Sequence, residues 1–177
     1  KPIEQGNEAN RIDFGNFNRL ADETARWLVA SLGEDLDELD LIVINQQVTD
    51  GIHRSALLQE QLQSLIQAHH DKPFLMDSRD MSQGYEGTMR KINGYEAVTL
   101  MGAQVEPRDV IGLDDIRRAG LKLAAQWGKT VFVSRGDRGC LVVDSDRVEV
   151  IPGLHIVEKT DPVGAGDSML AGIANTI

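Results

Sequence analysis

Residues Asp161 to Gly172 read Asp-Pro-Val-Gly-Ala-Gly-Asp-Ser-Met-Leu-Ala-Gly, and the interpretation of the whole chain starts from them. Gly164, Ala165 and Gly166 are small enough to leave their backbone N–H groups uncovered, and Asp167 begins a segment whose composition suits a helix. Because several unpaired N–H dipoles then point toward one spot, such a turn before a helix predicts an anion-binding site.

The carboxylate of Asp167 has two interpretations. Close to a bound phosphate a negative side chain is repelled, which makes its presence odd if the site only holds phosphate. It is explained if the carboxylate takes a proton from an attacking hydroxyl while the amides stabilise the transferring phosphoryl group. However, Asp is also a favoured helix N-cap and Gly a common turn residue. On this stretch alone, both a catalytic base and a structural cap stay open.

The composition limits the possible functions. With 177 residues, 41% of them hydrophobic, the chain can form one domain with a substantial core. A formal net charge of −10 disfavours nucleic acid and anionic membranes as partners, and no apolar run approaches the length of a membrane span. The single cysteine, Cys140, fits a reducing cytoplasm and is expected to be a buried structural thiol. The four histidines show no metal-ligand spacing and are assigned no chemistry.

Strands and helices alternate along the chain. Short apolar runs predict strands over 41–44, 73–76 and 130–134, and apolar residues at helical spacing predict helices over 20–31, 53–69 and 116–127. Gly33 and Gly128 are expected to end the first and third of these helices, and 140–143 with 147–151 to form an antiparallel hairpin. Residues 92–96 are expected to be a loop. This order predicts an α/β fold with a mostly parallel sheet and helices on both faces, in which 41–44 suits a central strand.

In a parallel sheet, the segments that follow the strands lie along one edge, where ligands gather. That edge would collect the following carboxylates, amides and arginines: Asp77, Glu96, Asp161, Asp167, Asn45, Gln46, Asn93, Arg79, Arg135 and Arg138. Carboxylate and amide oxygens suit Mg²⁺, and arginines suit phosphate, which Arg79 in particular could steady. A polar loop residue alone is more often solvated surface. Their recurrence at strand ends nevertheless predicts a phosphate site.

Three motifs, in this order, resemble those of the PfkB or ribokinase-like family of carbohydrate kinases. Asn93-Gly-Tyr-Glu96 is similar to the family's Asn-x-x-Glu motif, and Ser134 to Gly139 to its Ser/Thr-x-Gly-x-x-Gly nucleotide loop. Asp161 to Asp167 matches its Asp-x-x-Gly-Ala-Gly-Asp signature, with Pro162 where Thr is common. Lys91-Ile92-Asn93 resembles the Lys-Pro-Asn often found there. The resemblance implies a ribokinase-like doubly wound fold and transfer of the ATP γ-phosphoryl group to a hydroxyl of a sugar or sugar-like substrate.

The resemblance also implies a role for each matching residue. Asp167 would be the catalytic base, and the anion hole for the γ-phosphate would consist of Gly164, Ala165 and Gly166. Mg²⁺ and its waters would be organised by Asn93 and Glu96. The residues expected to bind ATP are Ser134, Gly136, Gly139 and Asp161, and Asp161 is also the candidate for a monovalent-cation site, such as one for K⁺.

As a relative of these kinases, the chain is expected to be a single domain over 1–177 that is truncated at both ends, with 1–15 leading out of a missing lid. The isolated piece is then expected to be inactive, and the parent to be a cytoplasmic enzyme and a possible homodimer. A nucleoside or vitamin-precursor kinase of the same superfamily is an alternative. A non-catalytic nucleotide-binding remnant is another, although a pure binder has no need of Asp167. A Rossmann-type oxidoreductase would require a dinucleotide fingerprint that this sequence lacks.

Overall fold

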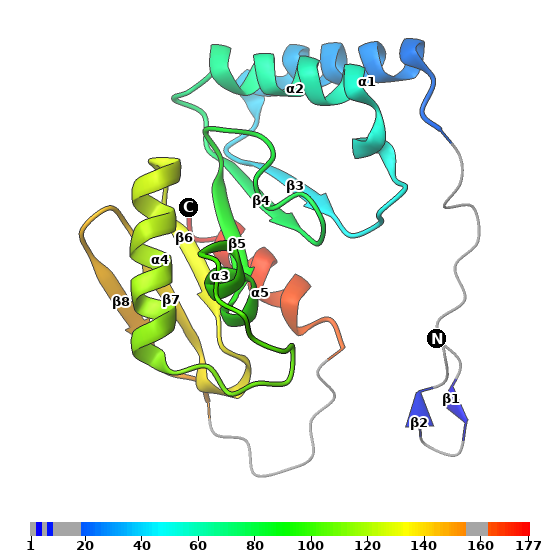
Figure 1. Cartoon of the computed structure of the whole chain (residues 1–177). Helices are drawn as coiled ribbons and strands as arrows, with labels where there is room; N and C mark the ends of the chain where they lie inside the picture. The colour runs from blue at the N-terminus through cyan, green and yellow to red at the C-terminus, as the bar shows by residue number, and fades with distance from the viewer. Residues whose placement is uncertain (1–2, 5–6, 9–18, 155–162) are drawn as a thin grey trace.

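The computed structural model describes residues 3–4, 7–8, 19–154 and 163–177 of the chain (Figure 1). Two short paired strands, β1 (Ile3–Glu4) and β2 (Asn7–Glu8), come first. The remaining strands are β3 (Ile42–Gln46), β4 (Phe74–Ser78), β5 (Met89–Asn93), β6 (Val131–Ser134), β7 (Cys140–Val143) and β8 (Val148–Ile151). The α-helices are α1 (Asp22–Asp35), α2 (Ala56–Ala68), α3 (Gly94–Leu100), α4 (Leu113–Trp127) and α5 (Ala165–Ala174). Short 3₁₀ turns are η1 (Leu36–Glu38), η2 (Ile52–Arg54) and η3 (Gly136–Arg138).

Strands β3 to β8 form one six-stranded sheet in the order β3-β4-β5-β6-β7-β8. The first four strands, β3 to β6, are parallel to one another, whereas β7 is antiparallel to β6 and to β8. The predicted α/β fold and the late hairpin are therefore confirmed. The register places Asp77 opposite both Asn45 and Lys91, and Asn93 opposite Ser134. Polar residues at the carboxyl ends of the parallel strands consequently meet at one edge of the sheet.

Helices α1 to α4 cover one face of this sheet, and α5 lies behind the other face (Figure 1). Residues opposite one another in neighbouring strands point to the same face, which puts Met76, Arg90 and Val131 in one row. Under α1 and α2 the core consists of Leu36, Ile42, Ile44, Leu62, Ile66, Phe74, Met76 and Tyr85. Under α3 and α4 it consists of Ile92, Ala97, Val98, Ile116, Ala119, Leu123, Ala124, Val131, Val133, Leu141 and Val143. None of the helices in the described part of the chain is long and apolar enough to cross a membrane.

Three expectations about the first half of the chain were wrong. Helix α1 does not end at Gly33; it continues to Asp35, and Gly33 instead faces α2, with its Cβ position 3.6 Å from a methyl group of Leu65. Trp27 is one of the residues whose helical spacing predicts the helix over 20–31, so its side chain was expected to face the core. It is instead 64% exposed, and Ala25 is the residue of α1 that is buried. Strand β3 is an edge strand of the described sheet, with 41% of Val43 exposed, because only β4 pairs with it.

The expected loop at 92–96 was also wrong, since strand β5 and helix α3 occupy this region. Arg90 and Lys91 interrupt the apolar pattern of β5, yet both side chains are buried. The Arg90 guanidinium donates to the carbonyls of Gly84 (2.7 Å) and Tyr85 (3.2 Å) and lies 4.3 Å over the ring centre of Trp127. Its burial lowers the pKa of Arg90 to about 10. Charged residues with such partners can occupy a central strand, which the apolar pattern alone does not reveal.

A half-buried histidine fixes the segment before β5. His53, in η2, shares a 2.8 Å hydrogen bond with the hydroxyl of Tyr85, and the two rings meet edge to face. Tyr85 is buried and has a positive φ of 52°. Burial lowers the pKa of His53 below its ordinary value of 6.5. Protonation of His53 therefore opposes this packing.

We expect the free energy of unfolding to fall as the pH drops below about 6.5. The unfolded chain binds a proton at His53 more readily than the folded chain, so the stability is complete above the unfolded pKa and is lost as the pH falls through the lowered folded pKa. Urea denaturation between pH 7.5 and 5 should show a weaker pH dependence for His53→Gln. The exposed His70→Gln serves as the control. If the free energy of unfolding depends on pH equally in wild type and His53→Gln, His53 is not the source of the pH dependence.

Candidate active site

A polar cavity of about 310 Å³ lies at the carboxyl ends of the parallel strands. Its lining contains Gln47, Asp77, Ser78, Arg79, Lys91, Asn93, Glu96, Ser134, Gly164, Gly166 and Asp167. A smaller cavity of about 190 Å³ shares Asn93 and Ser134 with it and is also lined by Gly136. Six of the predicted site residues thus line the polar cavity, Ala165 lies between two of them in sequence, and Gly136 lines the adjoining cavity. Asp161 is outside the described residues.

Helix α5 directs its N-terminus to this cavity. Gly164 is the N-cap, with a positive φ of 79°, and no side chain caps the helix. The first hydrogen bond within the helix runs from Ser168 N–H to the Gly164 carbonyl (2.8 Å), so the N–H groups of residues 165–167 have no acceptor in the helix. Asp167 is the third residue of the helix, which rules out the interpretation of its side chain as the N-cap. The first turn of α5 therefore has backbone N–H groups that make no hydrogen bond within the helix, and an anion hole at these groups stays a prediction.

A buried ion pair joins β4 and β5 on the same side of the sheet. Lys91 Nζ lies 2.6 Å from Asp77 Oδ2, and the two side chains are only 9% and 12% exposed. A Cβ atom at Gly166 would lie 3.4 Å from Lys91 Nζ, which brings this cation to the first turn of α5. The sequence interpretation gave Lys91 no role, although its place two residues before Asn93 in the family-like motif was a usable signal. A glycine at 166 leaves room for the lysine beside the free amides.

Asn93 and Glu96 form a capping box at the start of α3. Glu96 N–H donates to Asn93 Oδ1, and Asn93 N–H donates to Glu96 Oε2, both at 2.8 Å. Burial raises the pKa of Glu96, and the charge of Asp77 adds to this, while the bonds to Asn93 and the charge of Lys91 oppose it. Glu96 also lines the polar cavity, where a carboxylate can coordinate a cation. The two residues expected at the metal site are thus held in place by a helix terminus.

The loop after β6 contains two glycines, Gly136 and Gly139, for which the family resemblance implied the same role. Their surroundings in the structure differ. Gly136 has a φ of 63°, and a Cβ atom there would meet no atom within 4 Å. Gly139 has a φ of 85°, but a Cβ atom there would lie 2.1 Å from the carbonyl oxygen of Ile151 and 2.5 Å from Gly153 N. Gly136 therefore leaves open space for a ligand, whereas Gly139 is required by the packing of the chain against itself. Gly139 lines neither polar cavity.

Cys140 and His53, to which the sequence assigned no chemistry, have the surroundings of structural side chains. Burial raises the pKa of the partly buried Cys140 thiol, which disfavours the nucleophilic thiolate. His53 is engaged with Tyr85, and His155 is outside the described residues. Among the residues that the structure describes, no three His, Cys, Asp or Glu side chains are grouped to hold a metal.

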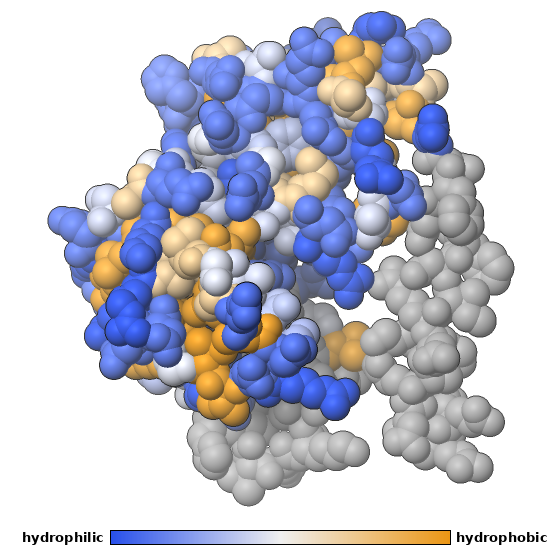
Figure 2. All heavy atoms as spheres, in the orientation of Figure 1, coloured by the Kyte–Doolittle hydropathy of each residue, from blue (hydrophilic) through white to orange (hydrophobic). Residues whose placement is uncertain are grey.

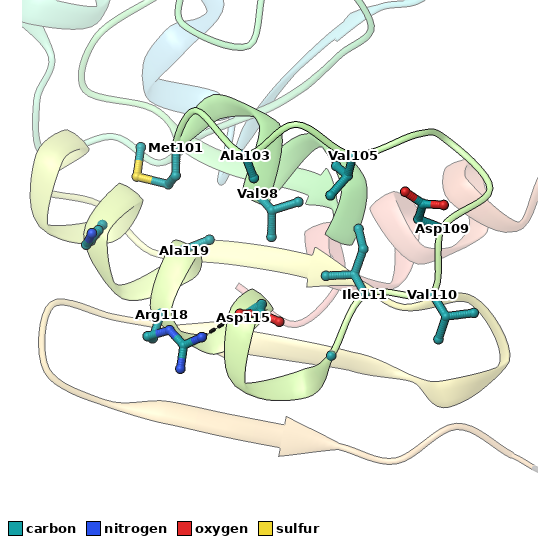
Figure 3. A pocket seen from close by; sticks show the side chains of 12 residues that line it. Val98, Met101, Ala103, Val105, Asp109, Val110, Ile111, Asp115, Arg118 and Ala119 are labelled. Atoms are coloured by element: carbon teal, nitrogen blue, oxygen red, sulfur yellow. Dashed lines mark hydrogen bonds and ion pairs between the residues drawn. The ribbon is translucent and has the colours of Figure 1, made fainter.

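A larger cavity, of about 610 Å³, lies between α3, α4 and the segment that joins them (Figure 3). Val98 and Ala119 point toward each other across it, and its nearby charged pair, Asp115 and Arg118, is already joined in an ion pair. The apolar surface on this side of the molecule gathers over the same region (Figure 2). None of the predicted site residues lines this cavity. Despite its smaller volume, the polar cavity at the sheet edge is the better candidate for chemistry.

Comparisons with known proteins agree with this fold. Phosphofructokinase-2 from Escherichia coli in complex with fructose-6-phosphate has 22% sequence identity and a TM-score of 0.61, over 89% of this chain and 50% of that one. The same enzyme in complex with potassium has 25% identity and a TM-score of 0.60, over 84% and 48%. Adenosine kinase from Sinorhizobium meliloti has 18% identity and a TM-score of 0.59, over 80% and 43%.

The chain spans about half the length of these structural neighbours. No curated protein matched the sequence. The model of the pfkB family of carbohydrate kinases, in contrast, matches residues 3–177. Together with the six-stranded sheet, this match shows that the chain belongs to the pfkB family of carbohydrate kinases.

Proposed function

We propose that the protein containing this chain transfers the γ-phosphoryl group of ATP to a hydroxyl of a sugar or sugar-like substrate. The observation that carries the proposal is the position of Asp167 in the first turn of α5, beside amides with no acceptor in the helix and lining the polar cavity. A carboxylate there can accept the proton of the attacking hydroxyl. The adjacent N–H groups can stabilise the charge that develops on the phosphoryl oxygens.

Stabilisation of the negative charge on the transferring phosphoryl group requires a cation in addition to the backbone amides of α5. Lys91 supplies a cation beside Gly166, and Asp77 holds that cation in one place. Positioned charges are the main contribution that a protein makes to phosphoryl transfer. Lys91 would therefore act together with the anion hole formed by residues 164–166.

The metal site fits Mg²⁺ through the chemistry of its donors. Glu96 and Asn93 both line the polar cavity, and the capping box fixes the carboxylate and the Asn93 side chain before any ion binds. Held by Asn93 and Glu96, Mg²⁺ would supply positive charge that offsets the negative charge of the phosphates. Ser134 and Gly136 would bind the nucleotide at the end of β6, where Gly136 leaves open space. The monovalent-cation role of Asp161, a homodimeric parent and a cytoplasmic location remain predictions.

Asp167→Asn in the full-length protein should lower kcat by about 10²- to 10⁴-fold, since a positioned base contributes that much. Because the amides remain, the dissociation constant of ATP·Mg²⁺ should change little. Asp114→Asn is a matched control, since Asp114 is an exposed acidic residue in the first turn of α4. A coupled assay for ADP release and isothermal titration would measure both quantities. Retention of most turnover in Asp167→Asn would refute the role of the base.

Gly136→Ala and Gly139→Ala should affect different properties, the first ATP·Mg²⁺ binding and the second mainly stability. Both place a methyl group at positive φ, which costs about 1–2 kcal/mol. Only in Gly139→Ala does the added methyl group also collide with backbone atoms. The free energy of unfolding of this variant, measured by urea denaturation, should therefore fall by about 1–3 kcal/mol more than that of Gly136→Ala. Gly136→Ala should instead weaken ATP·Mg²⁺ binding.

The control for this pair is Gly102→Ala. Gly102 has a φ of 84°, has no atom within 4 Å of its Cβ position, and lines none of the polar cavities described above. It should show the conformational cost of Gly136→Ala without the loss of ATP affinity. Equal ATP affinity for Gly136→Ala and Gly102→Ala would argue against a nucleotide near Gly136.

A further inference from the structure

The polar cavity has two sides, formed by different strands. Ser134, at the end of β6, lies on the side that adjoins the Gly136 cavity. The other side is formed by Gln47, which follows β3, by Ser78, the last residue of β4, and by Arg79, which follows β4. Because β5 lies between β4 and β6, the two sides are separated by two strand spacings, about 10 Å. If the nucleotide occupies the β6 side, as the proposed function requires, the acceptor lies on the β3–β4 side.

A buried glutamine fixes the backbone on the acceptor side. Gln46, the last residue of β3, is 3% exposed, and its Oε1 accepts from Ser78 Oγ (2.8 Å), Asp80 N–H (3.0 Å) and Arg79 N–H (3.1 Å). The Gln46 carbonyl also accepts from Arg79 N–H at 2.9 Å. The Gln46 Nε2 donates to Val48 O at 3.0 Å, which holds the carboxamide itself in one orientation. The backbone that carries the Arg79 side chain is consequently fixed from two directions.

The guanidinium of Arg79 is available for a ligand. It lines the cavity but forms no ion pair with any residue that the structure describes. The neighbouring carboxylates have other partners, because Asp77 pairs with Lys91 and Asp80 accepts from Thr49 Oγ1 at 2.6 Å. An exposed arginine is ordinarily solvated surface. This one differs in having a backbone anchored to a buried side chain and a place in the cavity wall.

We propose that Arg79, positioned by Gln46, recognises an oxyanion on the acceptor, so that the substrate is a sugar phosphate or a sugar acid and not a neutral sugar. The proposal rests on the proposed function, which assigns the two sides of the cavity. Arg matches phosphate and carboxylate oxygens through two parallel N–H donors. Gln46 is a positioning residue in this arrangement, and Arg79 is the residue that determines specificity.

The test uses the full-length protein and acceptors that differ in one charged group. Fructose is compared with fructose 6-phosphate, ribose with ribose 5-phosphate, and glucose with gluconate, each at saturating ATP·Mg²⁺. At least one charged member should have a kcat/KM more than about 10-fold above its neutral partner, as expected for a charge-assisted hydrogen bond. The first two pairs test a phosphate, and the third tests a carboxylate.

The variant Arg79→Gln should raise the KM for the charged acceptor by about 10- to 100-fold and leave the KM for ATP within about 3-fold. Arg79→Lys should recover part of the loss, because it restores the charge without the two parallel donors. Arg117→Gln, an exposed arginine of α4 that lines neither polar cavity, is the control.

Gln46→Leu tests the positioning role. It removes the acceptor of three hydrogen bonds and should raise the same KM for the charged acceptor, which a loss of stability alone would not do selectively. If Gln46 acts through Arg79, the double variant Arg79→Gln/Gln46→Leu should have nearly the acceptor KM of Arg79→Gln alone. Additive effects on this KM would overturn the positioning role.

The outcomes separate this proposal from the proposed function. Preference for a neutral acceptor, or phosphorylation of no charged one, would overturn an anionic substrate while leaving phosphoryl transfer intact wherever a neutral acceptor is used. If Arg79→Gln raises the KM for ATP but not the KM for the acceptor, Arg79 lies on the nucleotide side. That result would overturn its role in recognising the acceptor. Absence of both ATP·Mg²⁺ binding and transfer to any acceptor would count against the proposed function itself.

Discussion

The ion pair between Asp77 and Lys91 is the constraint on which the polar edge of the sheet depends. It joins two neighbouring parallel strands at their carboxyl ends and keeps a lysine charge next to α5. A buried pair of this kind is weak evidence for stability, because the desolvation of both charges offsets much of their attraction. Removal of either partner would leave the other charge buried alone, at a cost of about 3–5 kcal/mol. The pair is better understood as an arrangement that keeps a cation close to the first turn of α5, where we propose that phosphate binds.

The same strand shows why the fold could be predicted only in part. Strands β4, β6, β7 and β8 are short apolar runs, and their pattern was sufficient to identify them. β5 contains Arg90 and Lys91, whose burial depends on partners distant in sequence, namely Trp127 and Asp77. No pattern of hydrophobicity can supply those partners. The strand missed from the sequence is therefore also the one that carries charge to the site.

The site was more predictable than the packing around it. Small residues before an acidic helix start indicated the amides of α5, and local chemistry was sufficient for that prediction. The contributions of Lys91 and Gln46 were not visible in this way, since each depends on a register between strands. Likewise, the exposure of Trp27 depends on how α1 meets its neighbours. The sequence also could not separate Gly136 from Gly139, because the backbone that presses on Gly139 lies more than ten residues away.

The capping box formed by Asn93 and Glu96 has a consequence for how such enzymes change over time. The contacts that begin α3 are made by the side chains expected to serve the metal. Selection for a stable fold would therefore keep Asn93 and Glu96 even in a descendant that no longer turns over substrate. The N-cap of α5 does not use the Asp167 side chain, so the same selection would not keep Asp167. A lineage that loses catalysis would be expected to keep the first pair and lose the second residue. Persistence of the Asn-x-x-Glu motif is consequently a poor sign of activity, and persistence of the aspartate is a good one.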